Sequence, residues 1–343
     1  GFVALGTVAD VVPLIGENRI LVHYGLRSFA MTEHVGVRTL LEESRVRADA
    51  VLAETIAFRI APLINAAGRL GSPDRALDLL LSRDDEESRR LASWLGQANQ
   101  ERKAIENEMF EAGVEQIEAT GGVVLGRPIV VAREGWHSGV AGIVASRLVE
   151  RFRCPAFVIA VNDGLGRGSA RSLEGIPLEP FYEAARAHAE SIGGHALAGG
   201  LAVLPDRIDD LAGAIQAAAP PASRVDAASR YDLELTLGDI QPPLLQDLRQ
   251  LEPHGQANPT PCFRFRELRI EGDVRRIGKN EDHLTFLARQ GRRRIRVIYF
   301  RGAERARELT RIRNRFSVVA EIYLNDFRGN PRPELRLIDF GAD

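Results

Sequence analysis

Hydrophobic and polar positions follow different periods along the chain. The first segment opens on an apolar run, GFVALGTVADVV, with no cap, turn or initiator methionine before it. We predict a buried strand over residues 2–9, a turn at 13–18 with Gly16 and Asn18, and a helix over 19–34. Because a buried strand of a parallel sheet needs a neighbour on each side, we expect the sheet to continue before Gly1.

From about residue 48 to 120 the apolar positions recur at spacings of three and four, which predicts helices. One helix is expected over 49–70 and a second over 72–82, with Ser72 as N-cap and Pro73 at the first helical position. The charged stretch that follows predicts one helix of about 35 residues, near 50 Å at roughly 1.5 Å per residue. So long and polar a helix is typical of a strut between domains.

Strands and helices alternate between residues 121 and 222. Strands are predicted at PIVVA and CPAFVIAV, with a helix over AGIVASRLVERF between them, and GRGSARS continues as a strand or turn. A helix over LEPFYEAARAHAES is expected to end at Gly193-Gly194, and the strand LAVLP and a helix in DDLAGAIQ follow. The alternation predicts a small parallel or mixed sheet in an α/β fold, and PPASRVDAAS is the expected linker.

After residue 230 the pattern changes to short alternating strands. They are predicted at YDLELTL, FRFRELRIEGDVRRIG, HLTFLARQG, RRIRVIYF, FSVVAEIYLNDFRG and PELRLIDF, with helices at LLQDLRQLEP and AERARELTRI. Five or so short strands with one intervening helix predict a closed β-barrel of the OB type. An open antiparallel sheet is the alternative.

Composition narrows the class of protein. The 343 residues are 45% hydrophobic and 27% charged, a globular balance, and no apolar run approaches the roughly 20 residues of a membrane span. Two distant cysteines match no zinc spacing, so we expect a cytoplasmic protein without a disulfide scaffold. From Pro261 onward there are 20 basic and 12 acidic residues, a net +8 in a chain of net −2. The basic end indicates either a polyanion partner or merely a solvated surface.

Four short stretches carry candidate chemistry, and three of them favour an anion. Asp10, after the predicted strand, is a candidate ligand for Mg²⁺ or Mn²⁺ or simply a turn residue. His137 and Ser138 stand where a strand turns into a helix, whose free N–H groups attract phosphate. Arg167, Ser169 and Arg171 lie in GRGSARS, and in an extended segment the last two share a face, which suits a terminal phosphate.

The fourth stretch is GGHALAGG, residues 193–200. Gly193 and Gly194 could turn successive N–H groups into an anion nest, with His195 as a further donor. A buried histidine with satisfied hydrogen bonds is the alternative. Arg69 and Asn65, after the helix in RIAPLINAAGRL, add another cation near a glycine.

Taken together, these motifs resemble the RecJ single-stranded-DNA exonucleases of the DHH phosphoesterase family, over nearly the whole chain. The stretches that carry the resemblance are ALGTVADVVPL, FRIAPLINAAGRLGSPDRALDLLL, GWHSGVAGIVASRLVERF, GRGSARS, GGHALAGG and LEPHGQANPTPCF. It implies the C-terminal part of a DHH domain at 1–45, a helical connector at 46–120, a DHH-associated α/β domain at 121–222 and an OB domain at 226–343.

The resemblance also implies an activity and its residues. It implies a cytoplasmic 5′-to-3′ exonuclease of DNA repair and recombination that releases mononucleotides with two Mn²⁺ or Mg²⁺ ions. On that pattern Asp10 is a metal ligand, and Arg69, Ser169 and Arg171 hold the 5′ phosphate. The catalytic cleft is lined by His137 and by the turn formed by Gly193, Gly194 and His195, and the two histidines are the implied catalytic residues. Single-stranded DNA is the implied partner, with a single-strand-binding protein or a helicase as candidate protein partners.

The chain departs from the family pattern in three places. Gly199 stands where alanine is usual, a change we expect to be tolerated, and Ala257 stands where glycine is usual, which affects a local turn. The earlier Asp-rich and Asp-His-His motifs do not occur, so Asp10 alone cannot hold two ions. A catalytically incomplete exonuclease fragment is therefore the first hypothesis and a non-catalytic binding module the second. A phosphodiesterase for short or cyclic nucleotides is a third, which the basic barrel disfavours.

Overall fold

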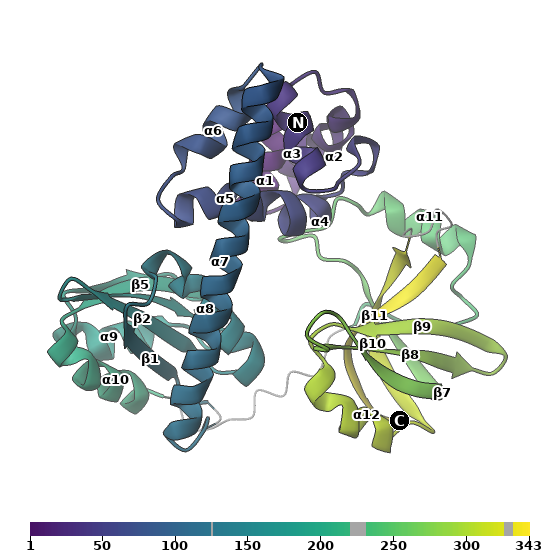
Figure 1. Cartoon of the computed structure of the whole chain (residues 1–343). Coiled ribbons are helices and arrows are strands. Elements are labelled where there is room, and N and C mark those ends of the chain that lie inside the picture. The colour runs from purple at the N-terminus through teal and green to yellow at the C-terminus, as the bar shows by residue number, and fades with distance from the viewer. Residues whose placement is uncertain (125, 220–230, 326–331) are drawn as a thin grey trace. The chain divides into compact units, whose positions relative to one another are not determined.

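The computed structural model describes residues 1–124, 126–219, 231–325 and 332–343, and the predicted linker at 220–229 lies outside these ranges. The chain divides into two compact units (Figure 1). The barrel unit comprises residues 1–28, 52–54 and 227–343, and the sheet unit comprises residues 29–51 and 55–226. In the described ranges no helix is both long and apolar enough to cross a membrane.

The barrel unit begins with two helices, α1 (Phe2–Ala9) and α2 (Gly16–Ser28). The predicted strand over 2–9 is therefore wrong. Ala4, Leu5 and Val8 are the buried residues of α1, and they lie at helical spacing. Because the exposed Phe2 and Val3 are also apolar and Thr7 is the one polar residue of the run, its sequence does not reveal the period.

Six strands make up the second part of the barrel unit: β6 (Leu233–Leu235), β7 (Cys262–Ile277), β8 (His283–Gln290), β9 (Arg293–Tyr299), β10 (Phe316–Asn325) and β11 (Arg332–Ala342). The helices α11 (Pro242–Gln250) and α12 (Ala306–Arg311) accompany them. The strand order is β10-β11-β9-β8-β7-β6, and β10 also pairs with β7. That pairing closes the sheet, so the OB-type barrel is confirmed and the open sheet is excluded.

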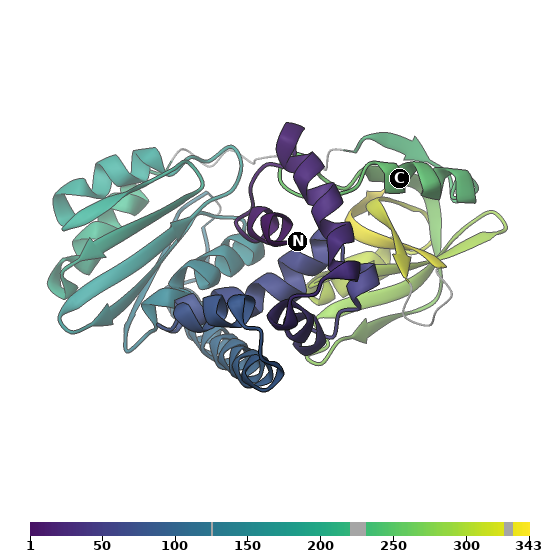
Figure 2. The ribbon, with the colours of Figure 1, turned by 90° about the horizontal axis from the view of Figure 1, so that it is seen from above.

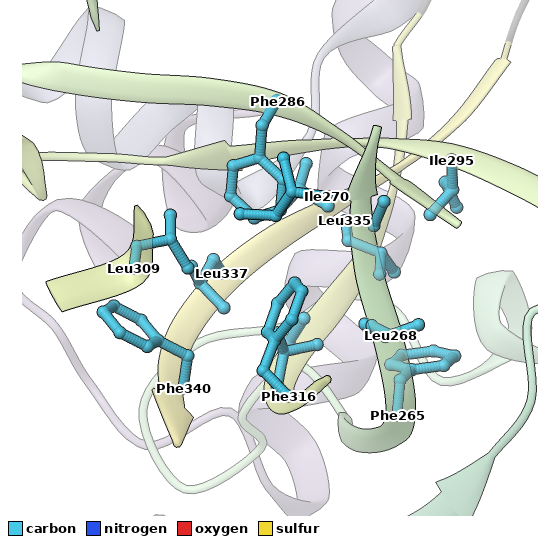
Figure 3. Close-up of a cluster of buried hydrophobic side chains, with 14 of the residues drawn as sticks. Phe265, Leu268, Ile270, Phe286, Ile295, Leu309, Phe316, Leu335, Leu337 and Phe340 are labelled. Atoms are coloured by element: carbon cyan, nitrogen blue, oxygen red, sulfur yellow. The ribbon is translucent and has the colours of Figure 1, made fainter. Parts of the chain in front are cut away.

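The barrel interior is filled by alternate residues of its strands (Figure 3). Phe265 and Phe316 are fully buried, and Phe286 packs on Phe316 with ring centroids 6.2 Å apart. Each such side chain contributes roughly 1.5–3 kcal/mol through burial. The alternation that predicted these strands is thus the alternation between this core and the solvent.

The sheet unit starts with short helices: α3 (Val35–Glu43), a π-helical turn (Ile56–Ile60), α5 (Ala61–Arg69) and α6 (Asp74–Leu81), with 3-10 turns at Phe29–Met31 and Ala48–Ala50. The short helix α4 (Ala53–Thr55) has its first two residues in the barrel unit and its last in the sheet unit. The N-cap position of α6 is Pro73, without a side-chain cap, so Ser72 does not cap it as predicted. The long helix α7 (Asp85–Ala119) has 35 residues, and the Asp84 side chain accepts a hydrogen bond from Glu87 N at its start. It packs against α3, α5 and α6, and farther along against α8 and β1.

The rest of the sheet unit is a five-stranded mixed sheet of order β1-β2-β3-β5-β4, as predicted. Its strands are β1 (Ile129–Glu134), β2 (Ala156–Asn162), β3 (Leu165–Arg171), β4 (Ser191–Gly194) and β5 (Ala198–Val203), and only the β1–β2 pairing is parallel. Helix α8 (Ser138–Phe152) connects β1 to β2, and α9 (Glu179–Ala185) and α10 (Ile208–Ala217) follow β3 and β5.

Helices cover both faces of this sheet (Figure 2). Strand β2 directs Val158 and Ala160 toward the core shared with α7 and α8. Its Phe157 and Ile159 point to the core shared with α9 and α10. Because both faces of β2 are buried, its sequence is one continuous apolar run. The pairing of β2 with β3 then determines which residues of β3 face α8.

Candidate functional site

The first turn of helix α8 is the centre of the candidate site. The helix begins at Ser138, and His137 is its N-cap, with Nδ1 accepting a hydrogen bond from Gly139 N at 3.2 Å. The loop before it is fixed by Asn162, whose Nδ2 donates to Trp136 O at 2.9 Å. The helix therefore starts earlier than the predicted Ala141, and its first N–H groups and partial positive charge lie at this end.

A hollow of about 540 Å³ lies at this helix start. His137, Ser138 and Arg167 line it, together with residues of the β1–α8 loop and of the β2–β3 turn. Three of the predicted site residues, from two separate motifs, therefore share one hollow. Helix N–H groups, a hydroxyl and a guanidinium together suit an anionic ligand.

Strand β3 presents Ser169 and Arg171 on the face that contacts α8, which confirms that they share a face. A Cβ added to the buried Gly142 of α8 would lie 2.9 Å from Arg171 Nη2 and 3.5 Å from Ser169 Oγ. Arg171 Nη1 also donates to Ala170 O at 2.8 Å. Burial lowers the pKa of Arg171. The guanidinium thus lies in the space left by a glycine and beside a hydroxyl.

Arg69 joins the same site from α5. It is the last residue of that helix rather than following it, and its Nη1 donates to Gly139 O at 3.1 Å. A Cβ on Gly139 would lie 2.4 Å from Arg69 O, so the ends of the two helices touch. The pKa of Arg69 is lowered first by burial and then by Arg102 and Arg171. Two arginines this close repel each other, and a bound anion between them would remove that repulsion and stabilise both charges.

Helix α7 adds an ion-paired group that the sequence reasoning missed. Arg102 is about nine-tenths buried; its Nη1 lies 2.6 Å from Glu106 Oε2 and its Nη2 donates to Asn99 Oδ1 at 2.9 Å. Arg147 of α8 pairs with the other Glu106 oxygen at 3.0 Å. The available signal was position: Arg102 follows the buried Leu95 and Ala98 at helical spacing. A charged residue on an apolar stripe indicates a buried polar contact.

The GGHALAGG stretch folds differently from the prediction. Gly193 and Gly194 are in β4, paired with Gly200 and Gly199 of β5, and do not form the predicted anion nest at a helix end. His195 lies in the turn, with its N–H donating to Ala198 O at 2.8 Å, and is exposed, so the buried-histidine alternative is also wrong. Because β5 pairs with β3, the hairpin borders the strand that carries Ser169 and Arg171.

Tyr182 of α9 is a second residue that the sequence reasoning missed. Its hydroxyl lies 3.5 Å from His195 O, to which it donates, and only 2.0 Å from where a Cβ on Gly199 would lie. Burial and the charge of Glu179 raise the pKa of Tyr182 to about 12, although Arg171 lowers it. The departure from alanine at Gly199 therefore leaves the room that the Tyr182 hydroxyl occupies. No local pattern distinguishes this tyrosine from an ordinary core residue.

Asp10, the predicted metal ligand, belongs to the barrel unit. It is exposed and is the C-cap of α1, so it does not follow a strand as predicted. In the described ranges no group of three or more histidine, cysteine or acidic residues could hold a metal ion. Two divalent ions need more oxygen ligands than one carboxylate supplies, so these residues do not fit a two-metal centre.

Two known domain families match separate parts of the chain. The DHHA1 domain family matches residues 126–219, and the RecJ OB domain family matches residues 231–339. The single-stranded-DNA-specific exonuclease RecJ of Bacillus subtilis (strain 168) is 32% identical over 341 residues, which cover 98% of this chain and 43% of the relative. That of Dickeya dadantii (strain 3937) is 39% identical over 285 residues, covering 78% and 48%.

Solved structures agree with the sequence relatives. The crystal structure of RecJ from Thermus thermophilus in complex with Mn²⁺ has a TM-score of 0.82 at 31% identity, covering 99% of this chain and 49% of that one. The Mg²⁺ complex from the same organism has a TM-score of 0.81. The chain spans about half the length of these proteins.

Proposed function

The chain belongs to the RecJ family, and from this premise we propose that it is the DNA-binding part of a single-stranded-DNA exonuclease acting 5′ to 3′ to release mononucleotides. The observation that carries the proposal is the convergence of Arg69, Ser169 and Arg171 on the first turns of α8. Relatives of this family are named for their action on single-stranded DNA.

In this proposal the cluster holds the 5′-terminal phosphate. Arg171 offers a guanidinium fork, Ser169 a hydroxyl, and the α8 start adds N–H groups and partial positive charge. Arg69 neutralises the remaining charge. His137 and the exposed His195 would face the strand next to that phosphate. A fixed terminal phosphate would set the direction of degradation, because it leaves the strand only one way to lie.

Mn²⁺ or Mg²⁺ would supply the attacking hydroxide and neutralise the phosphate under attack. Since the described residues do not fit such ions, the chain's own contribution is binding and orientation. The second candidate, a binding module without hydrolysis, makes the same prediction for this chain. We further propose a cytoplasmic location, and a single-strand-binding protein or a helicase as partners, because these proteins handle the single strands on which the enzyme would act.

The test compares 5′-phosphorylated with 5′-hydroxyl oligonucleotides by fluorescence anisotropy, with a Mn²⁺-dependent nuclease assay alongside. We expect the chain to bind both, to prefer the phosphorylated end, and to cleave neither. Arg171→Ala should abolish the preference, whereas the exposed Arg83→Ala should keep it. An equal loss on both ends would assign Arg171 to general backbone contact, and robust cleavage would contradict the ligand count.

A further inference from the structure

A second hollow, of about 380 Å³, lies on the barrel where β9, β10 and β11 meet. Its lining includes Phe300, Tyr323, Asn325, Glu334 and Arg336. All of them belong to the barrel unit, and none is in the proposed phosphate cluster, which consists of Arg69, Ser169 and Arg171. The hollow is large enough for a purine ring, so its lining decides what it can hold.

Two aromatic side chains give the hollow flat faces. Phe300 is 47% exposed and Tyr323 40% exposed. The Arg336 guanidinium carbon is 5.6 Å from the Phe300 ring centroid and 4.8 Å from that of Tyr323. Aromatic rings and guanidinium planes are the surfaces on which unpaired bases stack in proteins that bind single strands.

The charges in the hollow argue against a phosphate there. Arg336 is already paired with Glu54 at 2.8 Å and with Glu321 at 3.5 Å. The remaining ionised lining residue is Glu334, a carboxylate. An anionic group would therefore meet a neutralised guanidinium and a negative charge, whereas an uncharged base would meet neither problem.

Glu334 gives the hollow its selectivity. The side chain is only 9% exposed, and its Oε1 accepts from Asn325 Nδ2 at 3.1 Å and lies 3.6 Å from Arg296 Nη1. Within the described part of the chain, its buried Oε2 has no hydrogen-bond donor. A buried carboxylate oxygen without a donor costs free energy that a ligand N–H would recover.

We propose that this hollow binds one unstacked guanine of the DNA strand, with Glu334 accepting from its Watson–Crick edge. Guanine presents two adjacent donors there, N1–H and the N2 amino group, which match the two carboxylate oxygens. Adenine and cytosine place an acceptor nitrogen beside their amino group, and thymine places carbonyls on both sides of N3–H, so a carboxylate disfavours them. The inference rests on the proposed function and adds a base preference to it.

The test uses the 343-residue chain and a 5′-phosphorylated oligothymidylate in which one thymine is replaced by guanine at successive positions. Hypoxanthine, which lacks the 2-amino group, and adenine are placed at the same positions. We expect guanine at one position to raise affinity about tenfold, as for one good base contact, with hypoxanthine intermediate. Glu334→Gln should reduce the preference to about twofold or less and keep the affinity for oligothymidylate. The matched control Glu308→Gln, on the outside of α12, should keep both.

Phe300→Leu, at an exposed position, should weaken binding of every oligonucleotide that reaches the hollow. Equal affinity for guanine, hypoxanthine and adenine in the unaltered chain overturns the proposal, as does a guanine preference that survives Glu334→Gln. If the 5′-phosphate preference persists in that case, the proposed function stands and only the base pocket falls. If no oligonucleotide binds at all, both fall.

Discussion

Gly142→Ala tests the proposed phosphate cluster without removing any of its charged residues. Gly142 is buried in α8, and the added methyl group would lie 2.9 Å from Arg171 Nη2. Ordinary van der Waals contact begins at about 3.4 Å, so the guanidinium must move by roughly half an ångström or more. Because Nη2 ends a flexible side chain, the fold can absorb this movement.

The expected result separates stability from binding. Replacing glycine by alanine within a helix stabilises by about 1 kcal/mol, which offsets the cost of moving Arg171. A hydrogen bond to a charged group contributes about 1.5–3 kcal/mol. Losing one should weaken binding of a 5′-phosphorylated end by about 10- to 100-fold, while binding of a 5′-hydroxyl end changes little.

The matched control is Gly213→Ala in α10, where an added Cβ meets no atom within 4 Å. It should raise the melting temperature and leave binding of both oligonucleotides unchanged. Thermal unfolding and fluorescence anisotropy supply the two readouts. If Gly142→Ala binds the phosphorylated end as tightly as the unaltered chain does, then Arg171 does not hold that phosphate.

Three further predictions concern stability. Ala257 has φ of +61°, so Ala257→Gly should stabilise the chain by about 1 kcal/mol in urea unfolding, and a loss of stability would contradict the strain. Gly199→Ala should destabilise the folded chain by about 1–3 kcal/mol because its methyl group overlaps the Tyr182 hydroxyl. In a double-mutant cycle, Tyr182→Phe should recover part of this loss of stability, and strictly additive effects would disprove the contact. Burial lowers the pKa of His254 below its usual 6.5, so the neutral form is favoured in the folded state and stability should fall as pH drops through about 6.5; the same acid sensitivity in His254→Asn would assign it to another group.

The parts of the fold that the sequence predicted are those where burial sets a clear period. Strand β3 is an example: alternation alone placed Ser169 and Arg171 on one face, and the structure agrees. The 35-residue helix α7 was predicted for the same reason, because its apolar residues recur at a helical period among charged residues.

The failures have physical causes too. Residues 2–9 contain one polar residue, Thr7, so their pattern fits a helix and a strand equally well. In GGHALAGG the glycines permit many conformations, and only pairing with β3 selects the hairpin. Arg102 bonds to Asn99 and Glu106 in its own helix, but its effect on Arg69 involves a residue distant in sequence. The contact of Tyr182 with His195 likewise joins separate elements. Local pattern therefore picked out Arg69, Ser169 and Arg171, the proposed phosphate ligands, but missed Arg102 and Tyr182, whose charges act on Arg69 and Arg171.

The continuity of α7 has a consequence for how the sheet unit comes apart. Its buried residues form two groups, Ser88–Arg102 and Met109–Ile117, so a single helix contributes to the core beside α3, α5 and α6 and to the core beside α8 and β1. Unfolding of the whole of α7 would remove apolar cover from both groups of elements. The helical connector and the α/β sheet should accordingly lose amide-exchange protection together, as one cooperative block, and a protease should not release either as a stable fragment.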